Sequence, residues 1–225
     1  MHSVSRSVRV LVAAAFLASL AILLVPAHAV AAGPHVLPIA AARHLPLGTV
    51  VTVEGSVTVP SGVFASSFFD EGFAVQDFTA GIYVSMADNL GLTLRQQARV
   101  TGTLTDSGGL LVIIPLSDGD VSTHGRGAAV APIWVPTGAI GELTEGRIVQ
   151  VIGRITRLED DTPFGQKVFV NDGSGEIRVF INVGTGISVA GLAPGQLLAV
   201  TGFSGQFIDY EIDPRFPSDI RRPGH

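Results

Sequence analysis

Aromatic and cationic residues in the C-terminal half of the chain have a spacing suited to holding a polyanionic strand. Phe169 and Phe180 lie in two short apolar segments, each with a cation two residues away, at Lys167 and Arg178. An aromatic ring can stack on a nucleobase and contribute about 1–3 kcal/mol, while neighbouring cations neutralise phosphates. The predicted binding residues are therefore the following: Arg154, Lys167, Phe169, Arg178 and Phe180, with Tyr83 as a lesser contact.

This interpretation requires both phenylalanines to point away from the protein core. In a strand, successive side chains point to opposite faces. If Val168, Val170 and Val179 face the core, then Phe169 and Phe180 face outward. Two alternatives use the same residues. The rings could form a cross-strand pair that packs against another part of the chain or another subunit, or the parity of these strands could be the reverse.

The other residues that could do chemistry do not form a recognisable catalytic or metal site. The chain has no cysteine, and four histidines outside the N-terminal segment, His35, His44, His124 and His225, lack metal-ligand spacing. The carboxylates Asp70-Glu71 and Glu159-Asp160-Asp161 are expected in two matching loops, as a solvated rim. Residues 117–120 resemble the start of a calcium loop without its later glutamate, and residues 171–175 indicate a hairpin turn. We predict a protein that is not an enzyme and binds no metal and no cofactor.

The N-terminal segment is typical of a secretory signal peptide. Arg6 and Arg9 precede an apolar run over residues 10–25, and Ala27-His28-Ala29 follows with small residues at cleavage spacing. Sixteen residues fall short of the roughly 20 that span a bilayer. We predict cleavage after Ala29 or Ala31, giving an exported protein, periplasmic or extracellular, with no membrane span in the mature chain.

The charge balance limits how strongly such a protein could hold a polyanion. The 225 residues include 14 basic and 19 acidic side chains, for a net charge of −5, and loss of Arg6 and Arg9 would leave −7. Binders of nucleic acid usually carry a basic stripe. Any nucleic-acid binding is therefore expected to be weak and sensitive to salt.

The rest of the chain consists of an internal sequence repeat with two copies. Residues 38–55 match residues 136–153 at an offset of 98, and Val100-Thr101-Gly102 matches Val200-Thr201-Gly202 at an offset of 100. The middle of the pattern matches at an offset of 95, so insertions are confined to loops. The predicted organisation is a signal peptide over 1–29, a first repeat over 34–125, a linker over 126–131 and a second repeat over 132–225.

Each repeat is predicted to form five strands. In the first repeat, alternating valines over 51–59 indicate a half-buried strand, with Gly55 at a bend. Two short strands, 73–77 and 82–85, flank a turn at which Asp77, like Asp172 in the second repeat, is placed to accept hydrogen bonds from turn amides. An irregular link to residue 94 precedes a hairpin of strands 98–104 and 110–115.

A bent strand followed by two hairpins resembles the OB-fold barrel. The resemblance is carried by the G-x-x-V-x-V-x-G opening at 48–55, the F-A-V-Q-D-(x)₃-G-I-Y-V segment at 73–84 and the V-T-G triplets. These look like OB-fold modules of exported bacterial proteins, which resemble nucleic-acid-binding OB domains. The resemblance implies an all-β protein of two consecutive five-stranded Greek-key barrels, with ligands on the outer face of the second and third strands.

Two other functions remain open at this point. A structural or adaptor module that binds an envelope protein would use exposed apolar residues such as Phe68, Phe69 and Trp134. An oligosaccharide binder would use the same aromatic residues as a nucleic-acid binder but would be indifferent to salt.

Overall fold

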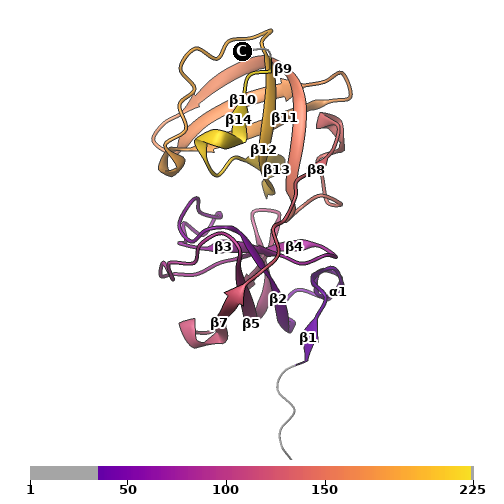
Figure 1. Cartoon of the computed structure of the whole chain (residues 1–225), viewed down its shortest axis with the longest axis vertical. Coiled ribbons are helices and arrows are strands. Elements are labelled where there is room, and N and C mark those ends of the chain that lie inside the picture. The colour runs from indigo at the N-terminus through magenta and orange to yellow at the C-terminus, as the bar shows by residue number, and fades with distance from the viewer. Residues whose placement is uncertain (1–34, 224–225) are drawn as a thin grey trace, which may run out of the picture. The chain divides into compact units, whose positions relative to one another are not determined.

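The computed structural model describes residues 35–223, and these residues form two seven-stranded sheets, each closed into a barrel (Figure 1). The predicted signal peptide lies outside the described residues. The first sheet contains these elements in chain order: β1(Val36–Leu37), β2(Val50–Val59), β3(Phe73–Gln76), β4(Gly81–Val84), β5(Gln96–Ser107), β6(Leu110–Ile114) and β7(Val121–Arg126). A short helix, α1(Ile39–Arg43), lies between β1 and β2.

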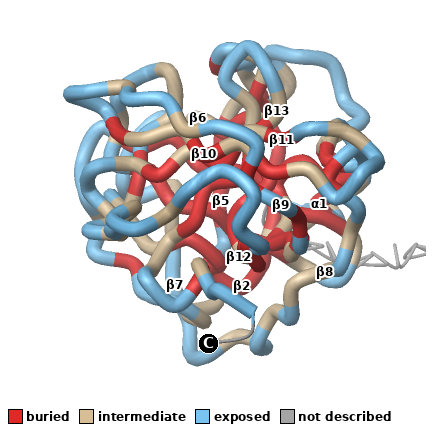
Figure 2. Tube along the Cα trace, turned by 90° about the horizontal axis from the view of Figure 1, so that it is seen from above, coloured by how far each residue is buried: buried red, intermediate tan, exposed pale blue. Residues whose placement is uncertain are grey.

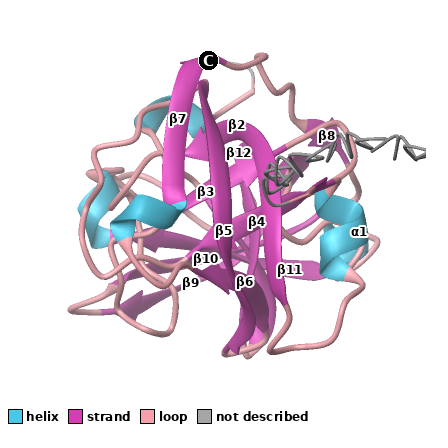
Figure 3. Ribbon diagram, turned by 90° about the horizontal axis from the view of Figure 1, so that it is seen from below, coloured by secondary structure: helices cyan, strands magenta, loops and turns pink. Residues whose placement is uncertain are grey.

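The second sheet repeats this order. Its strands are β8(Ile133–Trp134), β9(Ile148–Asp161), β10(Gly165–Asn171), β11(Glu176–Asn182), β12(Leu197–Phe207), β13(Asp209–Asp213) and β14(Ile220–Arg221). Helical turns are few and short, as Figure 3 shows. Among residues 35–223, no helix is long and apolar enough to cross a membrane.

The pairing of the five main strands in each sheet is that of an OB-fold barrel. β2 pairs with β3 along one half and with β5 along the other, and a two-residue parallel contact between β4 and β6 closes the barrel. In the second sheet, β9 pairs with both β10 and β12, and β11 meets β13 in parallel. The chain therefore folds as two consecutive five-stranded OB-fold barrels, as the sequence predicted.

Glycines at equivalent positions allow both barrels to close. A Cβ atom on Gly55 would lie 2.8 Å from the backbone oxygen of Gln76, and one on Gly153 would lie 2.8 Å from the backbone carbon of Asn171. Both glycines occur where the long first strand passes from one partner strand to the other. A side chain here would collide with the neighbouring backbone, so the spacing of the strands requires glycine.

Alternate residues of each barrel's strands fill its own core (Figure 2). In the first barrel this confirms the inward direction of Val75, Ile82 and Val84. In the second barrel, the buried residues are the ones that the alternation predicted: Val149, Val151, Ile155, Val168, Val170, Ile177, Val179 and Ile181. One residue departs from the pattern. A register shift between Val57 and Val59 turns Val59 out of the first core.

The aspartates predicted at the turns do accept hydrogen bonds from turn amides. Asp77 accepts from the amides of Thr79 and Ala80 at 2.7 and 2.8 Å, and from Ile39 at 2.9 Å. Burial opposes ionisation of Asp77, but these hydrogen bonds outweigh it and lower its pKa. Asp172 repeats the arrangement with the amides of Ser174 and Thr137. Each carboxylate thus ties its hairpin to the segment that precedes the barrel.

A third apolar cluster lies where the barrels meet. It joins outward-facing residues of the first barrel to two residues of the second, Ile148 and Phe203. The first barrel's contributions are Val59, Phe64, Ala74, Tyr83, Leu110 and Val112. This burial holds the two barrels together, since a fully buried apolar side chain is worth about 1.5–3 kcal/mol.

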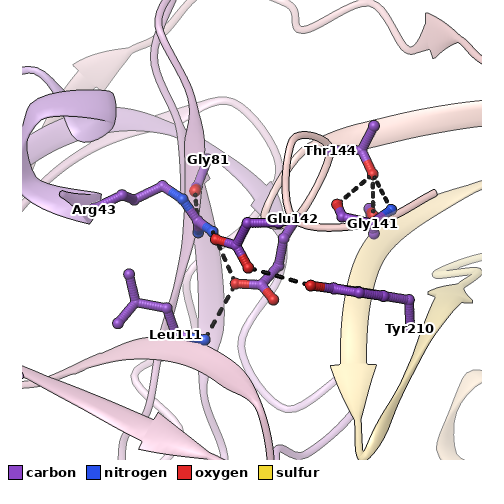
Figure 4. A network of polar contacts seen from close by, with 9 residues as sticks. Arg43, Gly81, Leu111, Gly141, Glu142, Thr144 and Tyr210 are labelled. Carbon is purple, nitrogen blue, oxygen red and sulfur yellow. Dashed lines mark hydrogen bonds and ion pairs between the residues drawn. The ribbon is translucent and has the colours of Figure 1, made fainter. Parts of the chain in front are cut away.

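Polar contacts border this cluster (Figure 4). The Arg43 guanidinium forms an ion pair with Glu145 at 2.8 Å and a second with Glu142 at 3.2 Å. Glu145 is almost fully buried, and it also accepts a hydrogen bond from the Leu111 amide at 3.2 Å. Burial raises the pKa of Glu145, against the opposing effect of Arg43. Contact between the barrels therefore depends on charge pairing as well as on apolar packing.

Candidate functional site

The outer face of β10 and β11 carries most of the predicted binding residues. Lys167 and Phe169 lie on β10 directly opposite Phe180 and Arg178 on β11, so the two phenylalanines are diagonal neighbours rather than a directly opposed pair. All four side chains are partly exposed, and Arg154 on β9 is exposed. The predicted outward parity of these residues is confirmed.

The structure divides these residues into two groups. Phe169 lies on the open part of the face with Arg157, a residue that the sequence analysis did not select. The Arg157 guanidinium carbon is 3.2 Å from the centre of the Phe169 ring, and the two residues are paired across β9 and β10. A register shift between Phe169 and Val170 brings Arg157 into this position. Simple alternation from Arg154 could not have located it.

The second group, Lys167, Arg178 and Phe180, lines a cavity of about 320 Å³. Residues 60–72 of the first barrel, which link β2 to β3, form the opposite wall with Phe64 and Phe69. The Phe69 ring contacts Phe164 of the second barrel, with ring centres 6.2 Å apart. The sequence analysis expected Glu159-Asp160-Asp161 in a loop matching residues 60–72, but these residues extend β9 instead. Only the first barrel therefore has a long loop at this position.

Every cation of this face is bonded to an acidic side chain or a backbone carbonyl. Lys167 pairs with Asp161 at 2.7 Å, and Arg178 pairs with Glu211 at 2.7 Å. Arg157 pairs with Glu176 at 3.0 Å and with Glu159. Arg154 donates to the carbonyl of Gly195 at 2.8 Å. The face is consequently close to neutral, rather than a basic stripe.

Tyr83 does not have the role predicted for it. Its side chain points out of the first barrel, but Phe64 of the first barrel and Phe203 of the second pack against it and leave it fully buried. The hydroxyl donates to Asp70 at 2.8 Å, and burial together with the Asp70 charge raises the pKa of Tyr83. Because the ring has no exposed surface, a ligand in solution cannot stack on it. It therefore cannot be the accessible stacking contact that its outward parity suggested.

Several of the remaining carboxylate and histidine candidates have structural partners, while His225 lies outside the described residues. Asp70 accepts hydrogen bonds from Ser85 at 2.5 Å and from Ser66 at 2.6 Å, so it fixes residues 60–72 rather than forming a free rim. Asp160 accepts from Thr162 and Gln166, whose hydrogen bonds lower its pKa. His124 lies 3.0 Å from Glu54. Within residues 35–223, no group of three or more histidine or acidic side chains is arranged to hold a metal.

Two carboxylates of β13, Glu211 and Asp213, also line the cavity and were not anticipated from the sequence. Both are buried, and burial raises the pKa of Glu211 to about 7 in spite of the attraction of Arg178. Burial and the nearby Glu211 charge raise the pKa of Asp213 well above its usual value. The alternating pattern of β13, with Ile212 in the core, was the signal that could have located them.

No protein-family description and no curated protein match this chain. Among solved structures, it is similar to OBody AM1L10 bound to hen egg-white lysozyme, with 24% identity and a TM-score of 0.34 over 41% of this chain and 96% of that chain. It is also similar to a murine DNA binding protein bound with double-stranded DNA, with 11% identity and a TM-score of 0.34 over 71% and 90%. The Thermus aquaticus single-stranded DNA binding protein aligns with 17% identity and a TM-score of 0.27 over 80% and 95%. Because these TM-scores lie below 0.5, the ligand of this chain has to be inferred from its own geometry.

Proposed function

We propose that this chain is an exported, non-catalytic binding protein whose second barrel binds single-stranded nucleic acid weakly. The observation that carries the proposal is the asymmetry between the barrels. The corresponding face of the first barrel is covered, whereas the outer face of β10 and β11 keeps Phe169 and Phe180 accessible. The first barrel then serves to position the ligand-binding one.

Phe169 and Arg157 supply the chemistry for stacking. The Arg157 guanidinium lies over the face of the Phe169 ring, so a base can stack on the outer side of the guanidinium or take its place on the ring, with little dependence on base identity. Phe180 extends the aromatic surface along the neighbouring strand. The strand must compete with Glu176, Glu159, Asp161 and Glu211 for the cations of this face. Binding is therefore expected to be weak and to fall as salt rises.

Fluorescence anisotropy of a labelled oligothymidylate, titrated at low and moderate salt, tests the proposal. Phe169→Ala should weaken binding by about 5- to 100-fold, the equivalent of about 1–3 kcal/mol for one stacked base. Phe78→Ala is the matched control, because Phe78 is 94% exposed and lies on a turn of the first barrel, away from the face. This control should bind as tightly as the unaltered protein.

Three results would contradict the nucleic-acid proposal. The first is no binding even at low salt, and the second is an equal loss of binding in both variants. The third is binding by way of Phe169 that salt leaves unchanged, which would favour an oligosaccharide on the same rings. Export is tested separately by the N-terminal sequence of protein recovered outside the cytoplasm, which should begin at Val30 or Ala32.

An adaptor function is the second candidate. The exposed residues at the edge of the cavity, Phe69, Phe164, Phe207 and Ile208, offer an apolar surface for an envelope protein. Phe69→Ser would weaken capture of such a partner without affecting oligothymidylate binding to Phe169. Phe169→Ala therefore tests nucleic-acid binding, and Phe69→Ser tests the adaptor function.

A further inference from the structure

The cavity beside the β10–β11 face has the walls of a small-molecule site. Its volume of about 320 Å³ is within the range of ligand pockets. Phenylalanines from both barrels are the most frequent residue type in its lining: Phe64, Phe69, Phe164, Phe180, Phe203 and Phe207. Two of them also contact each other across the barrel interface, with the ring centres of Phe64 and Phe203 5.7 Å apart. Aromatic rings from both barrels therefore face the cavity.

Backbone strain occurs at its edge. Phe69 has a φ of 56° and Ile208, just beyond the cavity residue Phe207, has a φ of 67°. Bulky side chains rarely adopt this left-handed conformation, and such residues persist only where the surroundings hold them. Hydrogen bonds do so here: the Phe69 amide donates to Ser66 at 3.0 Å, and the Ile208 amide donates to Gly108 at 2.7 Å. The chain therefore maintains an unfavourable backbone while keeping Phe69 78% exposed at the cavity.

One carboxylate of the cavity is not paired with a cation. Asp161 is paired with Lys167, and Glu211 is paired with Arg178. Asp213 lines the same cavity and is more than nine-tenths buried, yet among residues 35–223 its side chain has no hydrogen-bond or ion-pair partner. Its Oδ2 atom lies against Gly205, where a Cβ would come within 2.5 Å of it. An unpaired buried carboxylate is costly, and either protonation or a ligand that supplies the missing charge or donor removes the cost.

We propose that this cavity binds a small organic cation, a quaternary or protonated amine on a compact apolar body, with Asp213 as its counter-charge. The phenylalanine faces attract the cationic head through their ring quadrupoles and cover the apolar body. With Lys167 and Arg178 already paired, ionisation of Asp213 gives the cavity a surplus negative charge, which disfavours a phosphate or a carboxylate. Cation binding does not require nucleic-acid binding, because Asp213 supplies the charge and Phe169 and Arg157 take no part; Phe180 is the one ring used in both proposals.

The acidity of the carboxylates gives the site a defined pH dependence. A cation is bound best by ionised Asp213. Burial raises the pKa of Asp213 and of Glu211, so the ionised form becomes more populated as pH rises. The charged and titratable groups around Asp213 come from several strands. They are Glu211 on β13, Arg178 on β11, Lys167 on β10, Asp161 at the end of β9 and Tyr83 on β4 of the first barrel, with Asp70 and Glu71 beyond the tyrosine. Affinity for a ligand that does not itself titrate should therefore rise from pH 5 to pH 8.

Isothermal titration calorimetry with choline and its neutral isostere 3,3-dimethylbutan-1-ol is the experiment. Choline carries a fixed charge, so a change of affinity with pH reports on the protein alone. We expect choline to bind at least about tenfold more tightly than the alcohol, and more tightly at pH 8 than at pH 5. Asp213→Asn should remove about tenfold of the choline affinity and leave the alcohol unchanged. Asp209→Asn, an exposed position on the same strand, is the matched control.

Several results would overturn the proposal. Equal affinity for choline and the alcohol would leave only an apolar cavity, and undiminished choline binding by Asp213→Asn would remove the counter-charge role. Absence of choline binding in a protein shown to be folded by its urea unfolding curve would also overturn it. Phe207→Leu is a second variant, at the edge of the cavity, that should weaken choline binding. Oligothymidylate binding measured on the same Asp213→Asn sample distinguishes failure here from failure of the nucleic-acid proposal.

Discussion

The two barrels place different side chains at equivalent positions of the same face. Ala74, Tyr83 and Ser85 of the first barrel correspond to Phe169, Arg178 and Phe180 of the second. On the closing strand, Val112 and Ile114 correspond to Glu211 and Asp213, as the pairing of Val84 with Ile113 and of Val179 with Ile212 shows. Small and apolar residues made the first face a contact surface. Aromatic and charged residues left the second face open to a ligand.

The contact between the barrels is head-to-tail. The face of the first barrel packs on Ile148 and Phe203, which belong to a different surface of the second. Contacts of this kind can continue indefinitely from one unit to the next. The second barrel presents Arg178, Glu211 and Asp213 where a further unit would have to dock, and burying those charges would be costly. The residue types of this face therefore disfavour docking of another barrel on it.

Giving the first barrel a residue of the second should have the largest effect. Val112→Glu would put an unpaired charge into the buried contact beside Phe203, and we expect a loss of at least about 3 kcal/mol in the free energy of unfolding. Urea unfolding measures it. Val50→Glu is the control, since Val50 is 66% exposed and should change stability by less than about 0.5 kcal/mol. A small effect of Val112→Glu would mean that the contact contributes little.

Removing the unpaired charge from the second barrel should have an intermediate, stabilising effect. A buried carboxyl with a raised pKa keeps its proton in the folded state at pH values where the unfolded chain has lost it. Its contribution to stability is therefore lost as pH rises from the ordinary range of a carboxyl towards the raised pKa of Asp213 in the folded state. Asp213→Asn should raise the free energy of unfolding by about 1–2 kcal/mol at pH 8 and by less at pH 5. Urea unfolding at both pH values checks this, and equal shifts would show that Asp213 is already paired.

The smallest expected effect is that of Phe169→Ala, which tests whether the outer face of β10 and β11 is exposed to solvent. Phe169 is only partly buried, so Phe169→Ala should cost about 1 kcal/mol of stability, compared with about 3–5 kcal/mol for Phe203→Ala in the barrel contact. Thermal unfolding of the two variants gives the comparison. Similar losses would show that Phe169 is part of the packing, in agreement with the alternative left open by its sequence.

The repeat and the alternation of residues were enough to determine the fold and the direction of most strand side chains. Period-two patterns depend only on local strand geometry, so Val168, Val170 and Val179 predicted the core, and Phe169 and Phe180 the outer face. The turn aspartates were predictable for the same reason, since Asp77 and Asp172 bond to amides two or three residues away. Each of these features follows from short stretches of chain.

Tertiary structure alone decided which outward residues meet solvent and which meet another part of the chain. Tyr83 and Arg178 occupy equivalent outward positions, yet Phe64 and the second barrel's Phe203 bury Tyr83, because burial depends on what packs over a face rather than on the face itself. Register shifts had the same consequence at Val59 and Arg157, since one extra residue reverses a side chain's direction. The cavity that joins Phe69 to Asp213 needs residues 144 positions apart to converge, and no local pattern encodes that distance.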